Sequence, residues 1–313
     1  MALNLFPEKL DVNFMRWRFI AAAISLAVIV LTAIFIPLHG LNLGVDFRGG
    51  ALIEAQTQGP ANLTDIRSKL GALNIGDVGV QEFGAPDLVL IRAEGQDGED
   101  GANIAGAKVQ EELRKIAPGV DIRRVETVGG KVSGELIQAG VMALAFALLA
   151  MLVYVWFRFD SWHFGLGAMA SLLHDVMVTI GFFIVTKIEF NLSTVAALLT
   201  IIGYSINDTV VIFDRFREDI RKYKKMPLTE LFNLSINVTL PRTIVTSVTT
   251  LIAIGGMYAF GGDVIRSFTA AMIVGVIIGT YSTVFIATPL VLWAGYKRPS
   301  DRTEPDSAAR ASA

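Results

Sequence analysis

The chain has 313 residues, of which 53% are hydrophobic and 18% are charged, and its mean hydropathy of +0.54 is too high for a soluble domain of this length. The formal net charge of -2 gives no broad basic field of the kind that attracts nucleic acid. Because the chain has no cysteine, disulfides, thiolate metal sites and cysteine nucleophiles are excluded. The composition predicts an integral membrane protein.

The first apolar segment runs from Phe19 to Leu38 and follows several basic residues, so it has the form of either a secretory signal peptide or a permanent helix. It is about 20 residues long, which is enough to cross the hydrocarbon layer, and no small-residue cleavage pattern follows it. We therefore predict a transmembrane helix at residues 19–38, preceded by a cytoplasmic segment of residues 1–18.

A polar region, residues 39–134, follows this helix and contains no apolar run long enough to span a membrane. Its pattern predicts six elements in the order strand, helix, strand, strand, helix, strand, at residues 44–56, 63–73, 77–83, 87–93, 102–116 and 121–128. This βαββαβ order is that of the ferredoxin-like split unit, in which both helices cover one face of an antiparallel sheet. We expect a small α+β domain here.

Five further apolar segments bring the number of predicted transmembrane helices to six. They lie at residues 136–157, 164–186, 192–213, 243–260 and 268–293, within a bundle of residues 135–294. Lysines and arginines are concentrated near the termini, in the second-to-third connection and in the loop 214–242. The positive-inside rule places these parts in the cytoplasm and the ferredoxin-like domain outside. Residues 295–313 lack core-forming side chains and predict a disordered tail.

Within the loop 214–242, Leu228, Leu231 and Phe232 recur at helical spacing just after Pro227, which suits the first position of a helix. Two interpretations are open for this stretch. It is either a short helix lying on the membrane surface or a solvated connector whose apolar residues touch the helix ends.

The fourth apolar segment contains a carboxylate, Asp208, in a stretch that otherwise has the pattern of a membrane-spanning helix. A charge at the bilayer centre costs about 2.5–3.5 kcal/mol on insertion scales, so such residues usually face a polar interior and have a function. Thr200, Tyr204, Asn207 and Asp208 recur at steps of three or four, which predicts a polar stripe along one face of the helix. A carboxyl group that is protonated when buried alone, and ionised beside a cation or water, has the property that a proton carrier needs.

A basic residue, Arg242, opens the next apolar segment and is followed on the same helical face by Thr246, Thr249 and Thr250. We expect this face to meet the stripe that contains Asp208. Two roles are open for Asp208 and Arg242: a proton relay, or a fixed ion pair that only orders the bundle. Packed apolar residues would replace a purely bracing pair at lower cost, which favours the relay.

His174 and Asp175 form a second polar spot, near the middle of the third segment. Adjacent residues on a helix point about 100° apart, so at most one of them faces the polar seam squarely. Asp175 is interpreted as an auxiliary relay residue or as a structural hydrogen-bonding residue, and His174 as structural. Further ligands for a metal are missing, so we predict no metal site and no cofactor, with protons as the coupling ion.

The sixth segment has small residues at strict intervals of four, which form a ridge that lets another helix approach closely. The ridge consists of Ala271, Gly275, Gly279, Thr283 and Ala287. The sequence does not decide whether this ridge packs against an internal neighbour or against a second subunit.

Four local strings resemble the SecF family: residues 44–50 (GVDFRGG), 203–215 (GYSINDTVVIFDR), 242–243 (RT) and 260–262 (FGG). SecF is the partner of SecD in the accessory complex of the bacterial Sec export machinery, and it belongs to the resistance-nodulation-division superfamily. The resemblance extends from the first helix through the sixth. One departure lies before the second helix, where the family often has Val-Gly-Pro and this chain has Val128-Gly129-Gly130, a looser hinge.

The resemblance implies a six-helix, multi-pass subunit of the bacterial inner membrane with both termini in the cytoplasm. It implies pairing with SecD, and further partners in the SecY-SecE-SecG channel, YajC, membrane lipid and the translocating preprotein, which the periplasmic domain engages. In the family, the residues that match Asp208 and Arg242 are implicated in proton conduction. The expected function is therefore a non-enzymatic one, in which the proton motive force promotes late, ATP-independent translocation. The sequence has no Walker A phosphate loop.

Two alternatives remain. A half-subunit of a proton-driven small-molecule exporter of the same superfamily would use the same aspartate, although its external loops should be larger than the one modest domain predicted here. A membrane-embedded hydrolase would use Ser205 with His174 and Asp175. Ser205 lacks the G-x-S-x-G elbow, and a catalytic triad needs its histidine to be oriented by a separate group.

Overall fold

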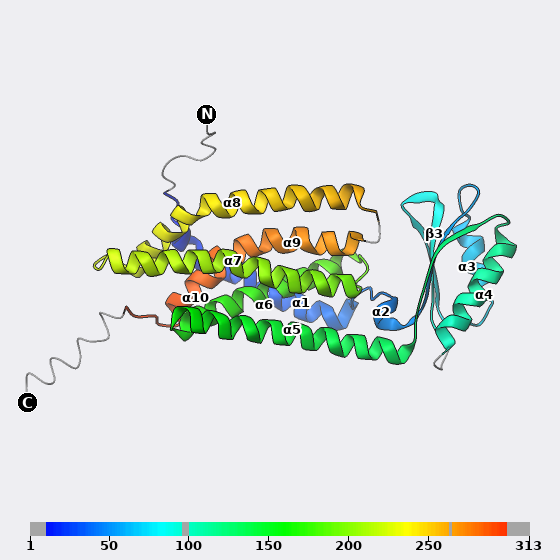
Figure 1. Cartoon of the computed structure of the whole chain (residues 1–313), viewed down its shortest axis with the longest axis horizontal. Helices are drawn as coiled ribbons and strands as arrows, with labels where there is room; N and C mark the ends of the chain where they lie inside the picture. Colours follow the sequence, from blue (N-terminus) through cyan, green and yellow to red (C-terminus); the bar gives the residue numbers. More distant parts are fainter. Residues whose placement is uncertain (1–10, 96–99, 263–264, 299–313) are drawn as a thin grey trace, which may run out of the picture.

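The structure is a computed structural model that describes residues 11–95, 100–262 and 265–298. Residues 1–10 of the predicted N-terminal segment and residues 299–313 of the predicted disordered tail lie outside the described residues. A bundle of long helices forms the larger part, and a four-stranded sheet with two helices forms a smaller part at one end (Figure 1). We call the smaller part, residues 50–128, the sheet domain.

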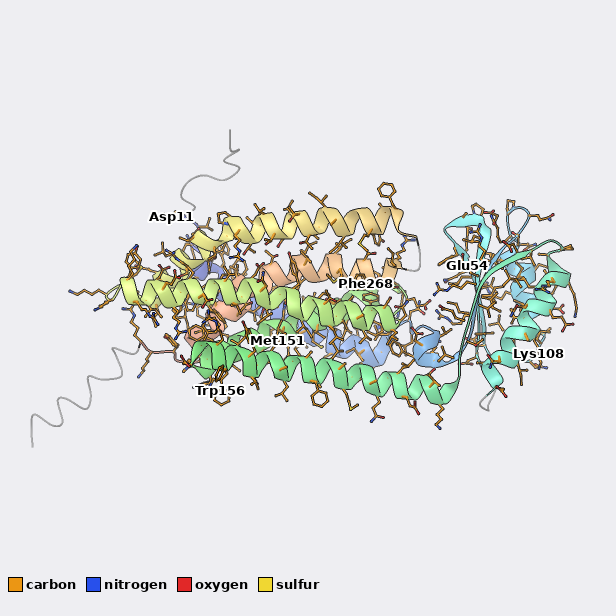
Figure 2. The ribbon with its side chains drawn as sticks, in the orientation of Figure 1. Asp11, Glu54, Lys108, Met151, Trp156 and Phe268 are labelled. Atoms are coloured by element: carbon orange, nitrogen blue, oxygen red, sulfur yellow. The ribbon has the colours of Figure 1, made fainter. Side chains whose placement is uncertain are left out.

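Six helices of the described part are long and apolar enough to cross a membrane, in agreement with the number predicted. They are η1 with α1 (Phe14–Trp17 and Arg18–His39), α5 (Gly130–Phe159), α6 (Trp162–Thr186), α7 (Leu192–Lys222), α8 (Leu228–Phe260), and α9 to α10 (Arg266–Ser282 to Thr288–Trp293). Many apolar side chains point away from the bundle, including Trp156, which is 57% exposed (Figure 2). An apolar outer surface of this kind suits contact with lipid.

The long predicted loop 214–242 is mostly helical in the structure. Helix α7 continues past Phe213 to Lys222, and α8 begins at Leu228, so that only residues 223–227 connect the two. Neither interpretation of the stretch after Pro227 is correct, because Leu231 and Phe232 are fully buried in the first turns of a continuous helix. The ring of Phe232 stacks on that of Phe216, with 3.5 Å between the ring centroids, and this contact packs α8 against α7.

Helix α9 does not continue directly into α10, because a π-helical turn, η3 (Thr283–Ala287), lies between them. Pro289, in the first turn of α10, has no amide hydrogen to donate to the preceding turn, which disturbs the regular helical hydrogen bonding at this point. Such turns often mark functional positions in helices. The sequence pattern predicted a single helix over the whole segment.

The sheet domain has the predicted order of elements. It consists of β1 (Gly50–Gln56), α3 (Leu63–Gly71), β2 (Val78–Phe83), β3 (Ala85–Ala93), α4 (Gly101–Ile116) and β4 (Asp121–Val128). The strands are antiparallel in the order β2-β3-β1-β4. Ile53 of β1 and Ile91 of β3 are fully buried against Leu113 of α4, so the two helices cover one face of the sheet. The other face is turned toward the bundle (Figure 1).

The connection from α1 to β1 differs from the prediction, because residues 45–48 form a short helix, α2 (Val45–Arg48), rather than the beginning of a strand. Two glycines in left-handed backbone conformations end it, Gly49 with φ 76° and Gly50 with φ 110°. A side chain at Gly50 would be impossible, since its Cβ would lie 2.2 Å from the carbonyl oxygen of Ala93. The Gly-Gly pair therefore lets the chain turn directly into the central strand.

Candidate functional site

Asp208 lies inside the bundle on α7 and is only 4% exposed. Its carboxyl group makes no hydrogen bond within 3.5 Å and no ion pair within 4.0 Å to any residue that the structure describes. Buried carboxyl groups are usually paired, because burying an unpaired charge is very costly. Asp208 is thus a buried acid without a charged partner within ion-pair distance among the described residues.

Arg242 lies on α8, and its positive charge acts on Asp208. It is exposed, and it lies within α8 rather than at its start, because the helix already begins at Leu228. The side-chain hydroxyl of the next residue, Thr243, also interacts with the carboxyl group of Asp208. The contact does not reach hydrogen-bond geometry, because the buried Oγ1 atom of Thr243 has no hydrogen-bond partner in the described part of the chain. The structure therefore does not contain the fixed Asp208–Arg242 ion pair that was the alternative to a relay.

The predicted polar stripe on α7 is divided between two environments. Thr200 and Asn207 are exposed, Tyr204 is half-buried, and Asp208 is buried. The Thr200 hydroxyl donates to the carbonyl of Ala196, one turn earlier in the same helix. Asp208 thus lies at the inner edge of the stripe, and the rest of the stripe faces an open surface of this subunit.

The hydroxyl groups that were predicted to face α7 from α8 make fewer contacts with α7 than expected. Thr246 and Thr249 donate to carbonyl groups of their own helix, α8. The cross-helix contact in this region is instead the Tyr204 hydroxyl, which donates to Thr250 Oγ1 at 3.3 Å. The α7 and α8 polar faces therefore meet through Tyr204 and Thr250, while Thr246 and Thr249 stay within α8.

Asp175 of α6 occupies the centre of a second, fully buried polar cluster. The Ser205 hydroxyl on α7 donates to Asp175 Oδ2 at 2.6 Å, and His174 Nδ1 lies 3.2 Å from Asp175 Oδ1. All three residues are at most 2% exposed. Both His174 and Asp175 therefore belong to the same cluster, although adjacent helical positions were expected to diverge.

This cluster does not have the order of a catalytic triad. In a triad the histidine lies between the serine and the carboxylate and accepts the serine proton. Here the carboxylate of Asp175 lies between the other two, and Ser205 donates to it directly. His174 therefore does not accept the Ser205 proton, which argues against the hydrolase alternative.

Two hydroxyl pairs extend the polar interior toward the π-helical turn and were missed from the sequence. Ser171 of α6 donates to Ser282 at 2.8 Å, and Thr209 of α7 lies 3.0 Å from Thr283, oxygen to oxygen. The helical spacing of Ser205 and Thr209, four residues apart on the face of α7 opposite the open surface, was a signal that could have revealed the second pair.

The small-residue ridge on α9 packs against α7 of the same chain. A Cβ atom at Gly275 would lie 2.3 Å from side-chain carbons of Ile201, and one at Gly279 would lie 3.1 Å from Ser205. The choice that the sequence left open is thus resolved in favour of an internal neighbour. Close approach of α9 is also what encloses the Ser205–Asp175 contact.

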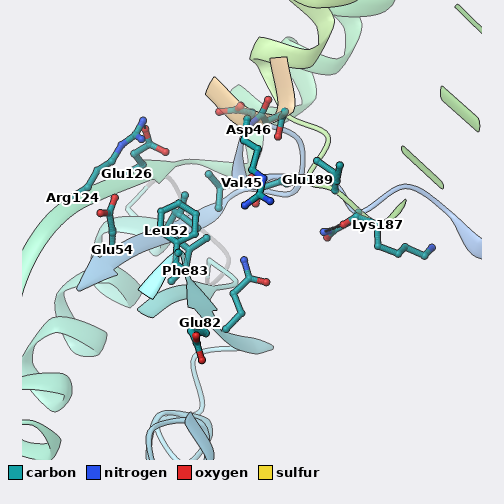
Figure 3. A pocket seen from close by; sticks show the side chains of 18 residues that line it. Val45, Asp46, Leu52, Glu54, Glu82, Phe83, Arg124, Glu126, Lys187 and Glu189 are labelled. Atoms are coloured by element: carbon teal, nitrogen blue, oxygen red, sulfur yellow. Dashed lines mark hydrogen bonds and ion pairs between the residues drawn. The ribbon is translucent and has the colours of Figure 1, made fainter. Parts of the chain in front are cut away.

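A cleft of about 330 Å³ separates the uncovered face of the sheet domain from the loop between α6 and α7 (Figure 3). Its walls include Leu52 and Glu54 of β1, Asp46 of α2, and Glu189 of the loop. Burial raises the pKa of the Glu189 carboxyl above its ordinary value, against the opposing effect of Arg92. Across the described ranges, no group of three or more acidic or histidine side chains is arranged to hold a metal ion.

Comparison with known proteins identifies the family. The family model of the protein export membrane protein SecD/SecF C-terminal region matches residues 108–297, and that of the SecD/SecF GG motif matches residues 34–61. The protein translocase subunit SecF of Rickettsia bellii is 44% identical over 290 residues, which cover 92% of this chain and 95% of the relative. The chain belongs to the SecF family. The SecF subunit of Rhodobacter capsulatus is 42% identical over 316 residues, covering 97% of this chain and 95% of that one.

Solved structures agree with this assignment. A crystal structure of SecDF, described as a translocon-associated membrane protein from Thermus thermophilus, matches with a TM-score of 0.81 and 33% identity over 92% of this chain. A SecDF structure in a super-membrane-facing form matches with a TM-score of 0.69 and 31% identity over 98% of this chain. This SecF-family chain spans only 39% and 41% of those longer chains, respectively.

Proposed function

We propose that this chain is an accessory subunit of the Sec protein translocase that pairs with SecD and uses the proton motive force to promote late, ATP-independent translocation across the inner membrane. The observation that supports this most directly is Asp208, a carboxyl group 4% exposed within the bundle and without a charged partner within ion-pair distance in the structure described. A site of that kind can exchange a proton as its surroundings change, whereas a paired carboxylate is held in one state.

Arg242 is proposed to act as the counter-charge for Asp208 in one stage of the cycle. It lies outside ion-pair distance, and its position on the exposed side of α8 leaves it free to approach when α7 and α8 move relative to each other. Asn207 and Thr200 lie on the open surface of α7, and Tyr204 is half-buried beside it. We propose that these residues line the interface with SecD, which completes the polar pathway.

The sheet domain is proposed to be a ferredoxin-like unit placed in the periplasm, where it contacts the translocating polypeptide. Both termini of the chain and the α7–α8 connection then lie in the cytoplasm. This agrees with the positive-inside rule, because basic residues are concentrated in and around the α7–α8 connection. The SecY-SecE-SecG channel and YajC are proposed as further partners on the basis of family membership alone.

Each proton that crosses 100 mV releases about 2.3 kcal/mol, so a few protons per cycle supply enough free energy for a conformational change of the sheet domain. The exporter alternative remains less well supported, because the external loops of such a half-subunit should be larger than the one modest sheet domain of the described structure.

Export from membrane vesicles tests the proposal. Asp208→Asn should abolish the part of export that depends on the proton motive force while the variant still copurifies with SecD. Unchanged late-stage export in this variant would refute the relay. Arg242→Lys tests the counter-charge separately, because lysine keeps the charge but loses the planar, bidentate geometry of the guanidinium group. Full activity of Arg242→Lys would show that charge alone is needed.

A further inference from the structure

The sheet domain is attached to the bundle by two covalent connections that lie next to each other. The first contains Gly49 and Gly50, and the second contains Gly129 and Gly130. A Cβ atom placed on Gly49 would lie 3.3 Å from the Cα atom of Gly130, which shows how close the two connections are. Two adjacent glycine-containing connections define a hinge, because they fix a line of attachment without fixing the angle about it.

An ion pair between β3 and the loop that joins α6 to α7 forms a third, non-covalent point of attachment. Arg92 of β3 donates through Nη2 to Glu189 Oε2 at 2.5 Å, and Glu189 belongs to the short loop between α6 and α7. The two side chains are only 22% and 19% exposed. Three points of attachment fix an orientation that two adjacent points leave open, so this contact determines the angle of the sheet domain relative to the bundle.

The loop that carries Glu189 is itself tied to the segment leading into the sheet domain. Phe190 donates its amide to the carbonyl of Asn42 at 2.8 Å, and its own carbonyl accepts from the amide of Gly44 at 2.9 Å. The Asn42 side chain donates to the carbonyl of Lys187 and accepts from Arg92 at 3.4 Å. These contacts leave little freedom between the loop and the entry segment.

The start of α7 is included in the same set of contacts. Asp46 of α2 accepts a hydrogen bond from the amide of Leu192, the first residue of α7, at 2.8 Å. Glu189 lies close against the entry segment, because a Cβ atom on Gly44 would lie 2.6 Å from Glu189 Oε1. The end of α7 nearest the sheet domain is therefore tied to α2 through Asp46, and the loop just before α7 contacts the sheet domain through Glu189. The same helix carries Asp208.

We propose that the Arg92–Glu189 ion pair, with Asn42 and Asp46 beside it, is the joint that makes the sheet domain follow the movement of α7. The proposal rests on the proposed function, because it gives the route by which a change at Asp208 reaches the sheet domain. Arg92 and Glu189 are positioning residues in this account and do not exchange the transported proton.

The charges around the Arg92–Glu189 ion pair determine which substitutions change this pair alone. The negative charges of Asp46 and Glu126 repel the Glu189 carboxylate, and the positive charge of Arg92 attracts it. Arg124 pairs with Glu126, and Lys187 donates to the carbonyl groups of His39 and Gly40. Glu82 of β2 lines the same cleft and is exposed, so Glu82→Arg provides a matched charge reversal outside the ion pair.

The absence of cysteine from the chain allows spin labels to be placed at two chosen positions. Lys108→Cys labels the exposed side of α4, and Val185→Cys labels the end of α6, where Val185 is 73% exposed. Pulsed electron–electron double resonance on the full chain in complex with cysteine-free SecD measures the distance between the two labels. This distance reports the orientation of the sheet domain relative to the bundle. Arg92→Glu and Glu189→Arg are measured singly and together, beside Glu82→Arg.

We expect one narrow distance distribution for the unchanged joint, for Glu82→Arg and for the double reversal, which re-forms the pair with opposite polarity. Each single reversal should broaden the distribution and lower the proton-dependent export rate several-fold, and the double reversal should recover both. Distributions for the single reversals as narrow as that of the unchanged joint would overturn the proposal.

Failure of the joint and failure of the relay are distinguishable in the same set of measurements. Asp208→Asn should lose proton-dependent export while it keeps the narrow distribution, because the joint is intact. If the single reversals broaden the distribution but leave export unchanged, the ion pair sets the orientation without serving coupling, and the proposal is refuted. If Asp208→Asn exports normally, the relay fails whatever the distributions show.

Discussion

Gly275→Ala is expected to destabilise the bundle even though alanine is the better helix former. The added methyl carbon would lie 2.3 Å from Cδ1 and from Cγ1 of Ile201, and 2.9 Å from Cγ2. Ile201 is fully buried in the cluster between α7 and α9, so it cannot move aside without repacking its neighbours. Overpacking a dense core costs about 1–3 kcal/mol, whereas the higher helix propensity of alanine returns at most about 1 kcal/mol.

The expected net result is a decrease of about 1–2 kcal/mol in the free energy of unfolding, measured by denaturant titration of the purified protein in micelles. Gly255→Ala is the matched control, because its added Cβ would have no atom within 4 Å apart from its chain neighbours and the nearby backbone of its own helix. That variant should be neutral or stabilised by up to about 1 kcal/mol.

A double-mutant cycle separates the clash from other effects. Ile201→Ala alone creates a cavity and should cost about 2–5 kcal/mol. Combined with Gly275→Ala it should cost less than the sum of the two single changes, by about 0.5–3 kcal/mol, because the new methyl group occupies vacated space. Strict additivity, or a Gly275→Ala variant as stable as Gly255→Ala, would refute the reasoning about close packing at this position.

Two further predictions concern buried carboxyl groups. Ser205→Ala removes the hydroxyl that donates to Asp175, and leaving that buried acceptor unsatisfied should lower the free energy of unfolding by about 1–3 kcal/mol; equal stability of Ser205→Ala would argue against the contact. Glu189 has a pKa raised above its ordinary value of 4.5, mainly by burial, so the folded state binds this proton more tightly than the unfolded chain does. Its contribution to stability is therefore fully present below pH 4.5 and is lost as the pH rises through the raised pKa. The thermal unfolding midpoint should therefore fall as the pH rises from 4.5 through the raised pKa of Glu189. If a Glu189→Gln variant shows the same dependence of the midpoint on pH as the unchanged chain, Glu189 is not the titrating group.

The sequence predicted the elements whose signal is local. Apolar length alone identified six spans, and the alternation of strands and helices gave the order of elements in the sheet domain. Asp208 was recognisable because a carboxylate among apolar residues stands out wherever the helix packs. The extension of α7 to Lys222 and of α8 back to Leu228 was missed, because a helix that leaves the hydrocarbon layer no longer needs an apolar sequence.

The pairing of polar groups could not be predicted, because it depends on which helices become neighbours. Ser205 and Asp175 are 30 residues apart, and Arg92 and Glu189 are 97 apart. Nothing local to either residue of these pairs indicates its partner. For the same reason, the pattern placed Arg242 and Asp208 on facing helices but could not show that they lie outside ion-pair distance.

Proton flux is the measurement that tests the central claim most directly. Vesicles that contain the complex of this chain with SecD are given a pH gradient, and proton entry is followed with an internal pH-sensitive dye. We expect Asp208→Asn to abolish the flux that depends on the complex, whereas Glu82→Arg, an exposed position in the sheet domain, should leave it unchanged. Equal proton flux through Asp208→Asn and the unchanged complex would contradict the account.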